Sequence, residues 1–183
     1  MKIKLNWYVI TGGPSSGKTT IINELSKLGY LIVPNMARVY IDQEIVKGKS
    51  LKELRSDETK FQRKILKIKI EAEEKMPKDK IVFLDNAVPC SIAYYQICGL
   101  DPKEVIQLCQ KEQYRKVFFL EQLPFEQDRA RTENLKTIGK LNRLLREAYE
   151  NLGYEVVFVP RFTPIRDISI AKRLELILTH VHY

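Results

Sequence analysis

Short apolar runs alternate along the chain with longer stretches in which apolar residues recur every three or four positions. Five of these runs have the length of buried strands: 5–10, 30–33, 81–84, 116–120 and 154–159. The stretches between them have the spacing of a helix face, as Ile21, Leu25 and Leu28 do. Strands that alternate with helices are typical of βαβ units. We therefore predict an α/β fold with a parallel sheet that helices cover on both faces.

The predicted helices are bounded by glycine and proline residues. They cover 19–28, 36–46, 51–75, 91–98, 102–111, 133–152 and 165–181. Gly29 and Gly153 directly follow two of them, at the position that helix ends favour for glycine. The longest helix carries a stripe of lysines, Lys60, Lys64 and Lys67, which we interpret as a solvent-exposed face.

Length and composition exclude several classes of protein. The chain has 183 residues, of which 44% are hydrophobic and 30% charged, and this excludes a disordered tail, a collagen-like fibre and a membrane bundle. No internal repeat or linker interrupts the pattern, so we expect one domain over 1–183. The absence of an apolar run of membrane-spanning length predicts no membrane span, and the opening residues do not have the pattern of a signal peptide.

The charged residues and the cysteines give weaker indications. Lysine and arginine outnumber aspartate and glutamate by 31 to 23, which gives a net charge of +8. A basic chain can bind nucleic acid, acidic lipid or a phosphorylated small molecule, and composition does not choose among them. Cys90, Cys98 and Cys109 are odd in number and form no C-x-x-C pair. They argue against a disulfide framework and favour a cytoplasmic location.

A glycine-rich segment follows the first predicted strand and opens the first predicted helix. It reads GGPSSGKT over residues 12–19 and matches the pattern G-x-x-x-x-G-K-[ST] in full. In this context the pattern predicts a P-loop, whose backbone N–H groups point inward around a phosphate. Lys18 would reach the β- and γ-phosphate oxygens, and the Thr19 hydroxyl would bind Mg²⁺. The predicted nucleotide-binding residues are Gly12, Gly13, Pro14, Ser15, Ser16, Gly17, Lys18, Thr19 and Thr20.

An aspartate stands at the end of the third predicted strand. Asp85 follows the apolar run IVFL, and the carboxyl ends of parallel strands face the crevice in which a P-loop lies. Asp85 is therefore a candidate to hold Mg²⁺ together with Thr19 and to take part in catalysis. The alternative interpretation is that Asp85 caps the helix that follows.

A polar segment follows the fourth predicted strand and carries two arginines. It reads EQLPFEQDRARTE over residues 121–133 and contains Arg129 and Arg131. An arginine on a mobile loop can close over phosphates and neutralise the charge that develops during transfer. We therefore predict a short lid at about 124–133, with both arginines as catalytic candidates. The alternative is an exposed loop with solvated arginines.

Several stretches along nearly the whole chain are shared with one known group of proteins. These are VITGGPSSGKTTIINEL, VPNMAR, VFLDNAVP with SIAYY, FFLEQLPFEQDRARTE, LREAYENLGYEVVFVP and AKRLELIL. The chain resembles the small P-loop ATPase domains of the AAA-28 type, which are similar to the ribosylnicotinamide kinase domain of NadR and to nucleoside and nucleotide kinases.

The resemblance implies a P-loop kinase-like fold with a five-stranded parallel sheet, in which the Asp85 strand lies next to the P-loop strand. It also implies ATP or GTP with Mg²⁺. Arg131 falls on the arginine of the family's D-x-x-R lid segment, and Arg38 falls where the acceptor substrate is expected. Pro160 lies in the loop that passes beside the adenine in such kinases, and Arg173 matches an arginine at the start of the last helix.

The chain departs from this family on the acceptor side. Where the family has Glu-x-x-Arg after the second strand, the chain has Asn35 and Arg38. Asparagine can hydrogen-bond a substrate but cannot take its proton. Where the family has Asp-Arg-x-x-x-Asp after the third strand, the chain has Asp85, Asn86 and Cys90. Asn35, Arg38 and Asn86 are the candidate substrate-binding residues, in an acceptor half that is altered while the donor half is intact.

Three hypotheses for function follow. The first is a Mg²⁺-dependent phosphotransferase that moves the γ-phosphate of ATP or GTP to a small nucleoside, nucleotide or similar metabolite. The second is a nucleotide-binding NTPase switch that acts through a protein or membrane partner, which the altered acceptor half favours. The third is a kinase of polynucleotide ends, for which the net charge and the lysine stripe argue. The first agrees best with the P-loop and the family resemblance.

Overall fold

A computed structural model of the chain describes residues 3–110, 112–123 and 135–181. Within these residues, the main sheet has five parallel strands in the order β3-β4-β2-β6-β7. The strands are β2 (Trp7–Thr11), β3 (Leu31–Val33), β4 (Val82–Asp85), β6 (Lys116–Leu120) and β7 (Val156–Val159). The predicted α/β fold with a five-stranded parallel sheet is confirmed, and so is the pairing of the Asp85 strand with the P-loop strand.

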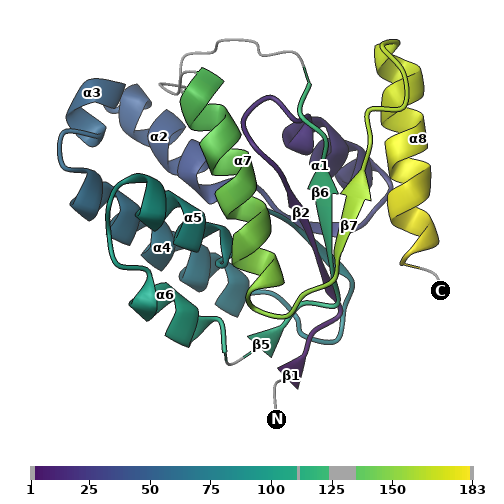
Figure 1. The fold of residues 1–183 in the computed structure, drawn as a ribbon, viewed down its shortest axis with the longest axis horizontal. Helices are drawn as coiled ribbons and strands as arrows, with labels where there is room; N and C mark the ends of the chain where they lie inside the picture. Colours follow the sequence, from purple (N-terminus) through teal and green to yellow (C-terminus); the bar gives the residue numbers. More distant parts are fainter. Residues whose placement is uncertain (1–2, 111, 124–134, 182–183) are drawn as a thin grey trace.

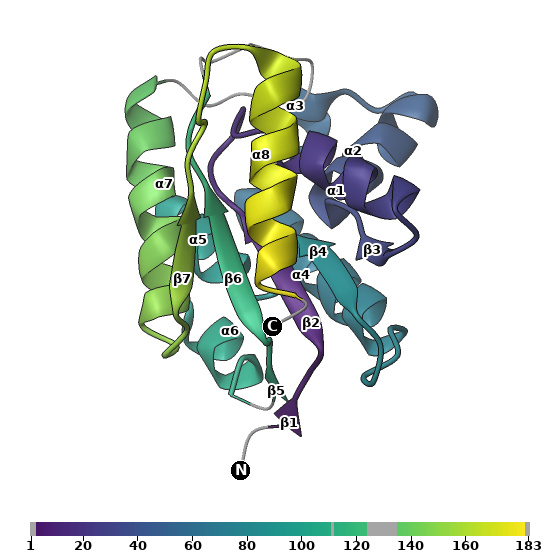
Figure 2. The ribbon, with the colours of Figure 1, turned by 90° about the vertical axis from the view of Figure 1, so that its right-hand side faces the viewer.

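Helices connect the strands and begin close to the residues that the apolar spacing predicts. They are α1 (Lys18–Lys27), α2 (Met36–Val46), α3 (Leu51–Leu54), α4 (Glu58–Glu74), α5 (Cys90–Ile97), α6 (Lys103–Leu108), α7 (Leu135–Glu150) and α8 (Arg166–Thr179). Figures 1 and 2 show α1 and α8 on one face of the sheet and α5 and α7 on the other. This is the doubly covered parallel sheet that the strand–helix alternation predicts.

The core is divided between the two faces of the sheet because side chains alternate along each strand. Trp7 and Val9 of β2 point to one face, where they pack with residues of α5 and α7. Tyr8 and Ile10 point to the other face and pack with residues of α1 and α8. Each face therefore buries an apolar layer, and the strand ends that carry polar residues are fixed between two packed layers.

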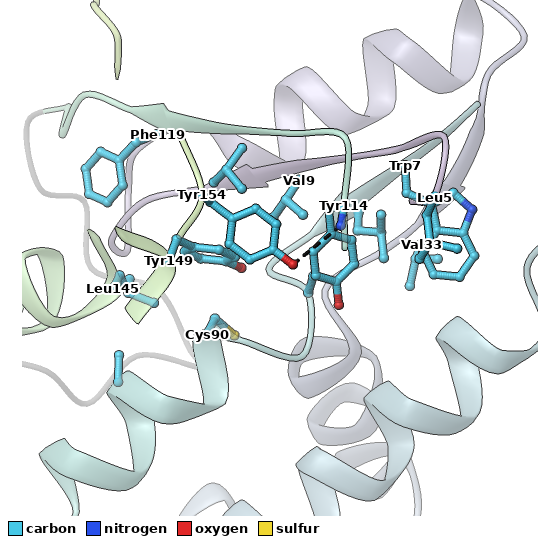
Figure 3. Close-up of a cluster of buried hydrophobic side chains, with 14 of the residues drawn as sticks. Leu5, Trp7, Val9, Val33, Cys90, Tyr114, Phe119, Leu145, Tyr149 and Tyr154 are labelled. Carbon is cyan, nitrogen blue, oxygen red and sulfur yellow. Dashed lines mark hydrogen bonds between the residues drawn. The ribbon is translucent and has the colours of Figure 1, made fainter. Parts of the chain in front are cut away.

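One part of the core is rich in tyrosine. Figure 3 shows Tyr149 of α7 and Tyr154 close to Tyr114, with Cys90 of α5 near the same cluster. The Tyr114 backbone N–H donates to the Tyr154 hydroxyl at 3.4 Å. The Tyr114 hydroxyl donates in turn to the buried carboxylate of Glu73 at 2.6 Å. Because Glu73 belongs to α4, these hydrogen bonds connect α4 to the segments that precede β6 and β7.

The sequence prediction was wrong about the segment 51–75, which is not one helix. It divides into α3, which Ser50 caps, and α4, because Asp57 caps a second helix start within the segment. The Ser50 side chain accepts from the Glu53 N–H in a capping box, and the Asp57 side chain accepts from the Lys60 N–H. The break lets the helical segment turn between α3 and α4, so that α4 can pack against both α2 and α5.

Two further strands were not predicted. Ile3–Lys4 (β1) and Glu112–Gln113 (β5) pair in parallel as a separate two-stranded sheet near the N-terminus (Figure 1). Two-residue strands are too short to carry a periodic signal, so the pattern could not reveal them. In the part of the chain that the structure describes, no helix combines the length and the apolar character that crossing a membrane requires.

Candidate functional site

The segment 12–19 forms a tight loop between β2 and α1 at the carboxyl edge of the sheet. Gly12 adopts φ +136, and a Cβ atom there would lie 2.8 Å from the Leu120 carbonyl oxygen. Gly17 adopts φ +88 and lies immediately before the first residue of α1. Glycine is required at both positions because other residues rarely adopt these angles. The helix start carries no acidic residue in its first turn, so the amide groups there favour an anion.

Lys18 is buried against its own loop. Its ammonium donates to the carbonyl oxygens of Gly12 at 2.8 Å and Gly13 at 2.7 Å, and contacts the Ser16 hydroxyl at 3.3 Å. Only 9% of the residue is exposed. The side chain therefore holds a cation at the mouth of the loop, next to the amide groups that would surround a phosphate.

Two side chains outside the motif support the loop from α7 and from the end of β6. The Gly13 N–H donates to the Asn142 side-chain oxygen at 2.7 Å. The Asn142 amide donates to the Gln122 side-chain oxygen at 3.1 Å, and the Gln122 amide donates to the Pro14 carbonyl. Sequence reasoning missed both residues, because an isolated Asn or Gln in a helix or loop carries no local signal for a contact that depends on tertiary packing.

Arg173 of α8 joins three separate backbone segments. Its guanidinium donates to the carbonyl oxygens of Ser16 at 2.7 Å, Pro160 at 3.0 Å and Glu121 at 3.1 Å. Only 2% of the residue is exposed. Arg173 thus fixes the P-loop to the segments that follow β6 and β7, and its described hydrogen bonds go to the chain's own carbonyl groups.

Asp85 lies at the end of β4, beside the P-loop, and is buried with 2% exposed. The Thr19 hydroxyl donates to its carboxylate, and the Asn35 side-chain amide lies 3.5 Å from it. Burial raises the pKa of the Asp85 carboxyl above its ordinary value, while the charges of Lys18 and Lys69 and the two side-chain hydrogen bonds oppose this rise. The structure therefore brings the two predicted metal ligands, Thr19 and Asp85, into direct contact.

The predicted acceptor residues also lie at this edge. Asn35 caps α2, and its side-chain oxygen accepts from the Arg38 N–H at 3.1 Å. The Arg38 Nε lies 3.0 Å from both carboxylate oxygens of Asp42. Asn86 adopts φ +58, and its side-chain oxygen accepts from the Thr11 hydroxyl at 2.8 Å. These hydrogen bonds fix the side chains at the start of α2 and at the end of β4.

Sequence reasoning also missed Lys69, which projects from α4. The residue is 4% exposed, in contrast to the exposed ammonium groups of Lys60 and Lys67 on the same helix. Its Nζ atom lies 2.6 Å from the Cys90 sulfur and 3.3 Å from the Ser91 hydroxyl. It also lies 5.8 Å from the centre of the Tyr94 ring. The prediction that Lys60 and Lys67 are solvent-exposed is confirmed, and the buried lysine lies outside that stripe.

A single cleft of about 530 Å³ connects these groups. Its wall on the P-loop side consists of Pro14, Ser15, Ser16, Gly17, Lys18, Thr19, Thr20 and Ile21. The opposite end is lined from α2, α3–α4 and α5 by Asn35, Ala37, Arg38, Ile41, Arg55, Phe61, Gln62, Ile65, Lys69, Asn86 and Tyr94. A third wall comes from the segment that follows β6, from the segment between β7 and α8, and from α8 itself, with the lining residues Leu123, Arg161, Thr163, Pro164, Arg166, Ser169, Ile170 and Arg173.

Four predicted residues are not among those that line this cleft. Gly12 and Gly13 form the base of the loop, and Asp85 lies beneath Thr19. Pro160 contributes its carbonyl oxygen to Arg173, while the next residue, Arg161, lines the cleft in its place. Arg129, Arg131 and the predicted lid at 124–133 lie outside the described residues and stay predictions.

Comparison with known proteins assigns the family. A family model described as an AAA domain, of the AAA-28 type, matches residues 7–166. The chain belongs to this family. The match of the AAA-28 family runs from the start of β2 to the start of α8, so it contains the P-loop and all of the cleft lining except the part that α8 contributes after residue 166. No curated protein matches the chain in sequence.

Solved structures share the fold of this AAA-28 domain. A NadR protein in complex with NR has a TM-score of 0.66 at 16% identity, over 97% of this chain and 51% of NadR. Thymidylate kinase from Ehrlichia chaffeensis has a TM-score of 0.66 at 16% identity, over 97% and 98% of the two chains. Deoxyadenosine kinase from M. mycoides has a TM-score of 0.64 at 17% identity, over 96% and 98%. The chain spans about half the length of NadR and nearly all of either kinase.

Proposed function

We propose that this AAA-28 domain is a Mg²⁺-dependent phosphotransferase. It moves the γ-phosphoryl group of ATP or GTP to a small acceptor of the nucleoside, nucleotide or related metabolite type. The observation that carries this proposal is the single cleft, in which a complete P-loop faces a second, organic-molecule-sized end lined from α2, α4 and α5. A protein that only bound or hydrolysed a nucleotide would not need this second end.

The P-loop end has the groups that phosphoryl transfer requires. The amide groups of the loop and the Lys18 ammonium would surround the β- and γ-phosphates, where they neutralise charge in the transition state. The adjacent oxygen donors of Thr19 and Asp85 fit Mg²⁺, which prefers hydroxyl, carboxylate and phosphate oxygens. When bound, the ion supplies charge neutralisation at the bridging phosphate oxygens. Arg173 holds the loop rigid, since it bonds the Ser16 carbonyl from beneath.

The far end of the cleft supports a small organic acceptor. Phe61, Ile65 and Tyr94 give it apolar walls, and Arg38 and Lys69 add charge. Among proteins with this fold, a deoxyadenosine kinase structure contains the products dCMP and dCDP, and a NadR structure contains NAD with AMP-PNP. The free thiols Cys90, Cys98 and Cys109 are in keeping with a cytoplasmic setting for the proposed reaction.

The NTPase-switch hypothesis has one observation in its favour. Asn35, which stands where the family pattern has a glutamate, uses its side-chain oxygen to cap α2 and has no proton-accepting carboxylate. The polynucleotide-end hypothesis has less support, because Lys60 and Lys67 of the lysine stripe lie within 4 Å of Asp57 and Glu71. Hydrolysis without an acceptor is therefore the main competitor of transfer.

The proposal is tested by measuring ADP or GDP formation against a panel of acceptors. With MgATP or MgGTP, at least one nucleoside, nucleotide or vitamin-like compound is expected to raise the rate well above that with water alone. The phosphorylated product should be detected by mass spectrometry in an amount equal to the additional ADP or GDP. If no compound of a broad panel raised the rate above basal hydrolysis, the transferase proposal would fail and the switch hypothesis would take its place.

Replacing Asp85 with asparagine should separate stability from activity. Burial raises the pKa of the Asp85 carboxyl in the folded protein. At neutral pH the ionised carboxylate therefore lowers the free energy of unfolding of the wild type, so Asp85→Asn should unfold at a higher urea concentration. This gain should vanish as the pH falls into the acidic range, where Asp85 becomes protonated in the wild type. The rate at limiting Mg²⁺ should fall by about 10- to 100-fold, because a group that holds the ion is lost.

The control for Asp85→Asn is the same exchange at an exposed aspartate outside the cleft. Asp42 is exposed but pairs with Arg38 in the cleft, so it does not serve. Asp79→Asn is suitable, since Asp79 is exposed and lies outside the cleft on the segment before β4. If D85N were less stable than the wild type at neutral pH, or kept its full activity at low Mg²⁺, the role assigned to Asp85 would be wrong.

A further inference from the structure

The cleft is lined by positive charge. Among the described residues that line it, the charged ones are Lys18, Arg38, Arg55, Lys69, Arg161, Arg166 and Arg173, and no aspartate or glutamate is included. The nucleotide's triphosphate accounts for the cations near the P-loop. Arg38, Arg55 and Lys69 line the opposite end, where the acceptor would lie. Arg38 and Arg55 each lie within 4 Å of a carboxylate, that of Asp42 and that of Glu58 respectively, so Lys69 is the cation at this end that needs explaining.

Lys69 is the cation that the fold buries most deeply at this end. It is 4% exposed, and its direct contacts are the Cys90 thiol, the Ser91 hydroxyl and the Tyr94 ring. Among the described residues, no carboxylate lies within salt-bridge distance of Lys69, and the charge of Lys69 acts on the Asp85 carboxyl only from beyond that distance. Removing an ammonium from water without a carboxylate partner costs free energy, so an anion that reaches Lys69 would be bound strongly.

The group in direct contact with the Lys69 ammonium is the Cys90 thiol and not a carboxylate. The 2.6 Å contact means that a carboxylate at position 90 would pair directly with Lys69. Asn35 and Asn86 also line the cleft, and neither amide carries a charge. None of these three side chains therefore offsets the charge of Lys69 at the acceptor end.

This end of the cleft also lacks the proton-accepting group that a hydroxyl acceptor needs. A hydroxyl loses its proton when it is phosphorylated, and Asn35 cannot accept a proton. Asp85 does not line the cleft and is hydrogen-bonded beneath Thr19. A phosphate monoester needs no base, because its second pKa of about 6 leaves it mainly a dianion at neutral pH.

We propose that the acceptor is a phosphate monoester with an apolar or aromatic body, such as a nucleoside 5′-monophosphate. The proposal rests on the proposed function and names the class of its acceptor. Arg38 and Lys69 bind the acceptor phosphate, and Phe61, Ile65 and Tyr94 contact the body. An acceptor phosphate oxygen forms a bond to the γ-phosphorus while the bond from that phosphorus to the β,γ-bridging oxygen breaks. The products are a diphosphate and ADP or GDP, and no proton is released from the attacking oxygen.

The body of the acceptor is held by a mixed aromatic and polar wall. The Arg55 guanidinium lies 5.5 Å from the centre of the Phe61 ring, and its Nε lies 2.6 Å from the Glu58 carboxylate, so the ring and this ion pair together form one part of the cleft wall. Gln62 lies beside Phe61 on α4 and is 4% exposed, and it also lines the cleft. An aromatic ring with a neighbouring amide fits a flat heteroaromatic body better than a flexible aliphatic chain.

The test compares matched pairs of acceptors that differ only in the phosphate. ADP formation from MgATP, and GDP formation from MgGTP, are measured with each common nucleoside and with its 5′-monophosphate. The kcat/KM of the best monophosphate is expected to exceed that of its own nucleoside by at least about 100-fold. The nucleoside lacks the charged contact to the cleft's cations, and losing such a contact in a site that excludes water has an effect of this size. A nucleoside that matched or exceeded its monophosphate would overturn this inference and leave the phosphotransferase proposal standing. If neither the nucleoside nor the monophosphate of any pair raised ADP or GDP formation, the phosphotransferase proposal itself would be wrong.

Two variants locate the acceptor phosphate. Lys69→Met should raise KM for the best monophosphate by about 10- to 100-fold while KM for ATP changes little, since only the acceptor end loses a cation. Cys90→Asp should lower the preference for monophosphate over nucleoside, because the new carboxylate neutralises Lys69 without removing it. Lys67→Met is the matched control, as Lys67 is exposed on the same helix. Variants are compared only after their thermal unfolding curves show that they fold. If folded Lys69→Met and Cys90→Asp both kept the wild-type KM and preference, Lys69 would not bind the acceptor phosphate.

Discussion

Replacing Lys18 with alanine is expected to lower the rate of phosphoryl transfer by on the order of 10³-fold. The Lys18 ammonium lies against the loop, where it donates to the carbonyls of Gly12 and Gly13. Without it, the charge that builds on the β- and γ-phosphate oxygens would lose its main protein partner. The measurement is kcat for ADP formation with a saturating acceptor, together with nucleotide affinity by calorimetry.

Lys27→Ala is the matched control for this experiment. Lys27 ends the same helix, is exposed, and pairs with Glu24 at 2.7 Å. Its replacement should leave both rate and nucleotide affinity within about twofold of the wild type, since surface ion pairs contribute little. A Lys18→Ala protein that folds and keeps more than a tenth of the wild-type rate would show that this loop is not the donor site.

Replacing Arg173 with methionine is expected to lower the free energy of unfolding by about 3–5 kcal/mol. Three backbone carbonyls, those of Ser16, Pro160 and Glu121, would each lose a charged donor in a nearly water-free environment. Methionine keeps most of the side-chain volume, so the loss reports the hydrogen bonds and not a cavity. The measurement is urea unfolding with and without nucleotide.

The Arg173 variant should also bind nucleotide more weakly, because the Ser16 carbonyl anchors the P-loop to α8. Added MgATP should recover part of the lost stability, since ligand that binds only the folded state stabilises it. Lys172→Met, at the exposed neighbouring position, is the control and should change the free energy of unfolding by less than about 0.5 kcal/mol. Equal stability of the two variants would contradict the structural role assigned to Arg173.

Much of the fold could be predicted because the strands and helices have different periods. The run KVFFL has the length and composition of a buried strand, and β6 occupies the same residues. The helix Met36–Val46 likewise has the predicted bounds. The boundary between α3 and α4 was missed because the apolar spacing continues through it, while the cap at Asp57 starts a new helix. Local hydrogen bonds at a helix start thus outweigh an unbroken hydrophobic pattern.

The donor end of the candidate site could be predicted, whereas much of the acceptor end could not. The P-loop is a contiguous motif whose backbone geometry depends on glycine at fixed positions. Lys69 has no such signal, since a lysine on an amphipathic helix is usually solvated and only the packing of α4 against α5 buries it. The family resemblance matched Arg173 to an arginine of the last helix, and the structure shows that its direct partners are backbone carbonyls that shape the loop. Contacts between distant segments therefore decided the roles that the sequence left open.

The destination of the γ-phosphoryl group tests the central proposal most directly. The reaction is run with MgATP, or with MgGTP, and a responsive acceptor in water enriched in heavy oxygen, and products are weighed by mass spectrometry. Transfer within the cleft predicts that the acceptor gains one phosphoryl group that contains no oxygen from the solvent, in an amount equal to the ADP or GDP formed. If all of the γ-phosphate instead appeared as inorganic phosphate carrying one solvent oxygen, the domain would be a hydrolase and the proposed phosphotransferase function would be wrong.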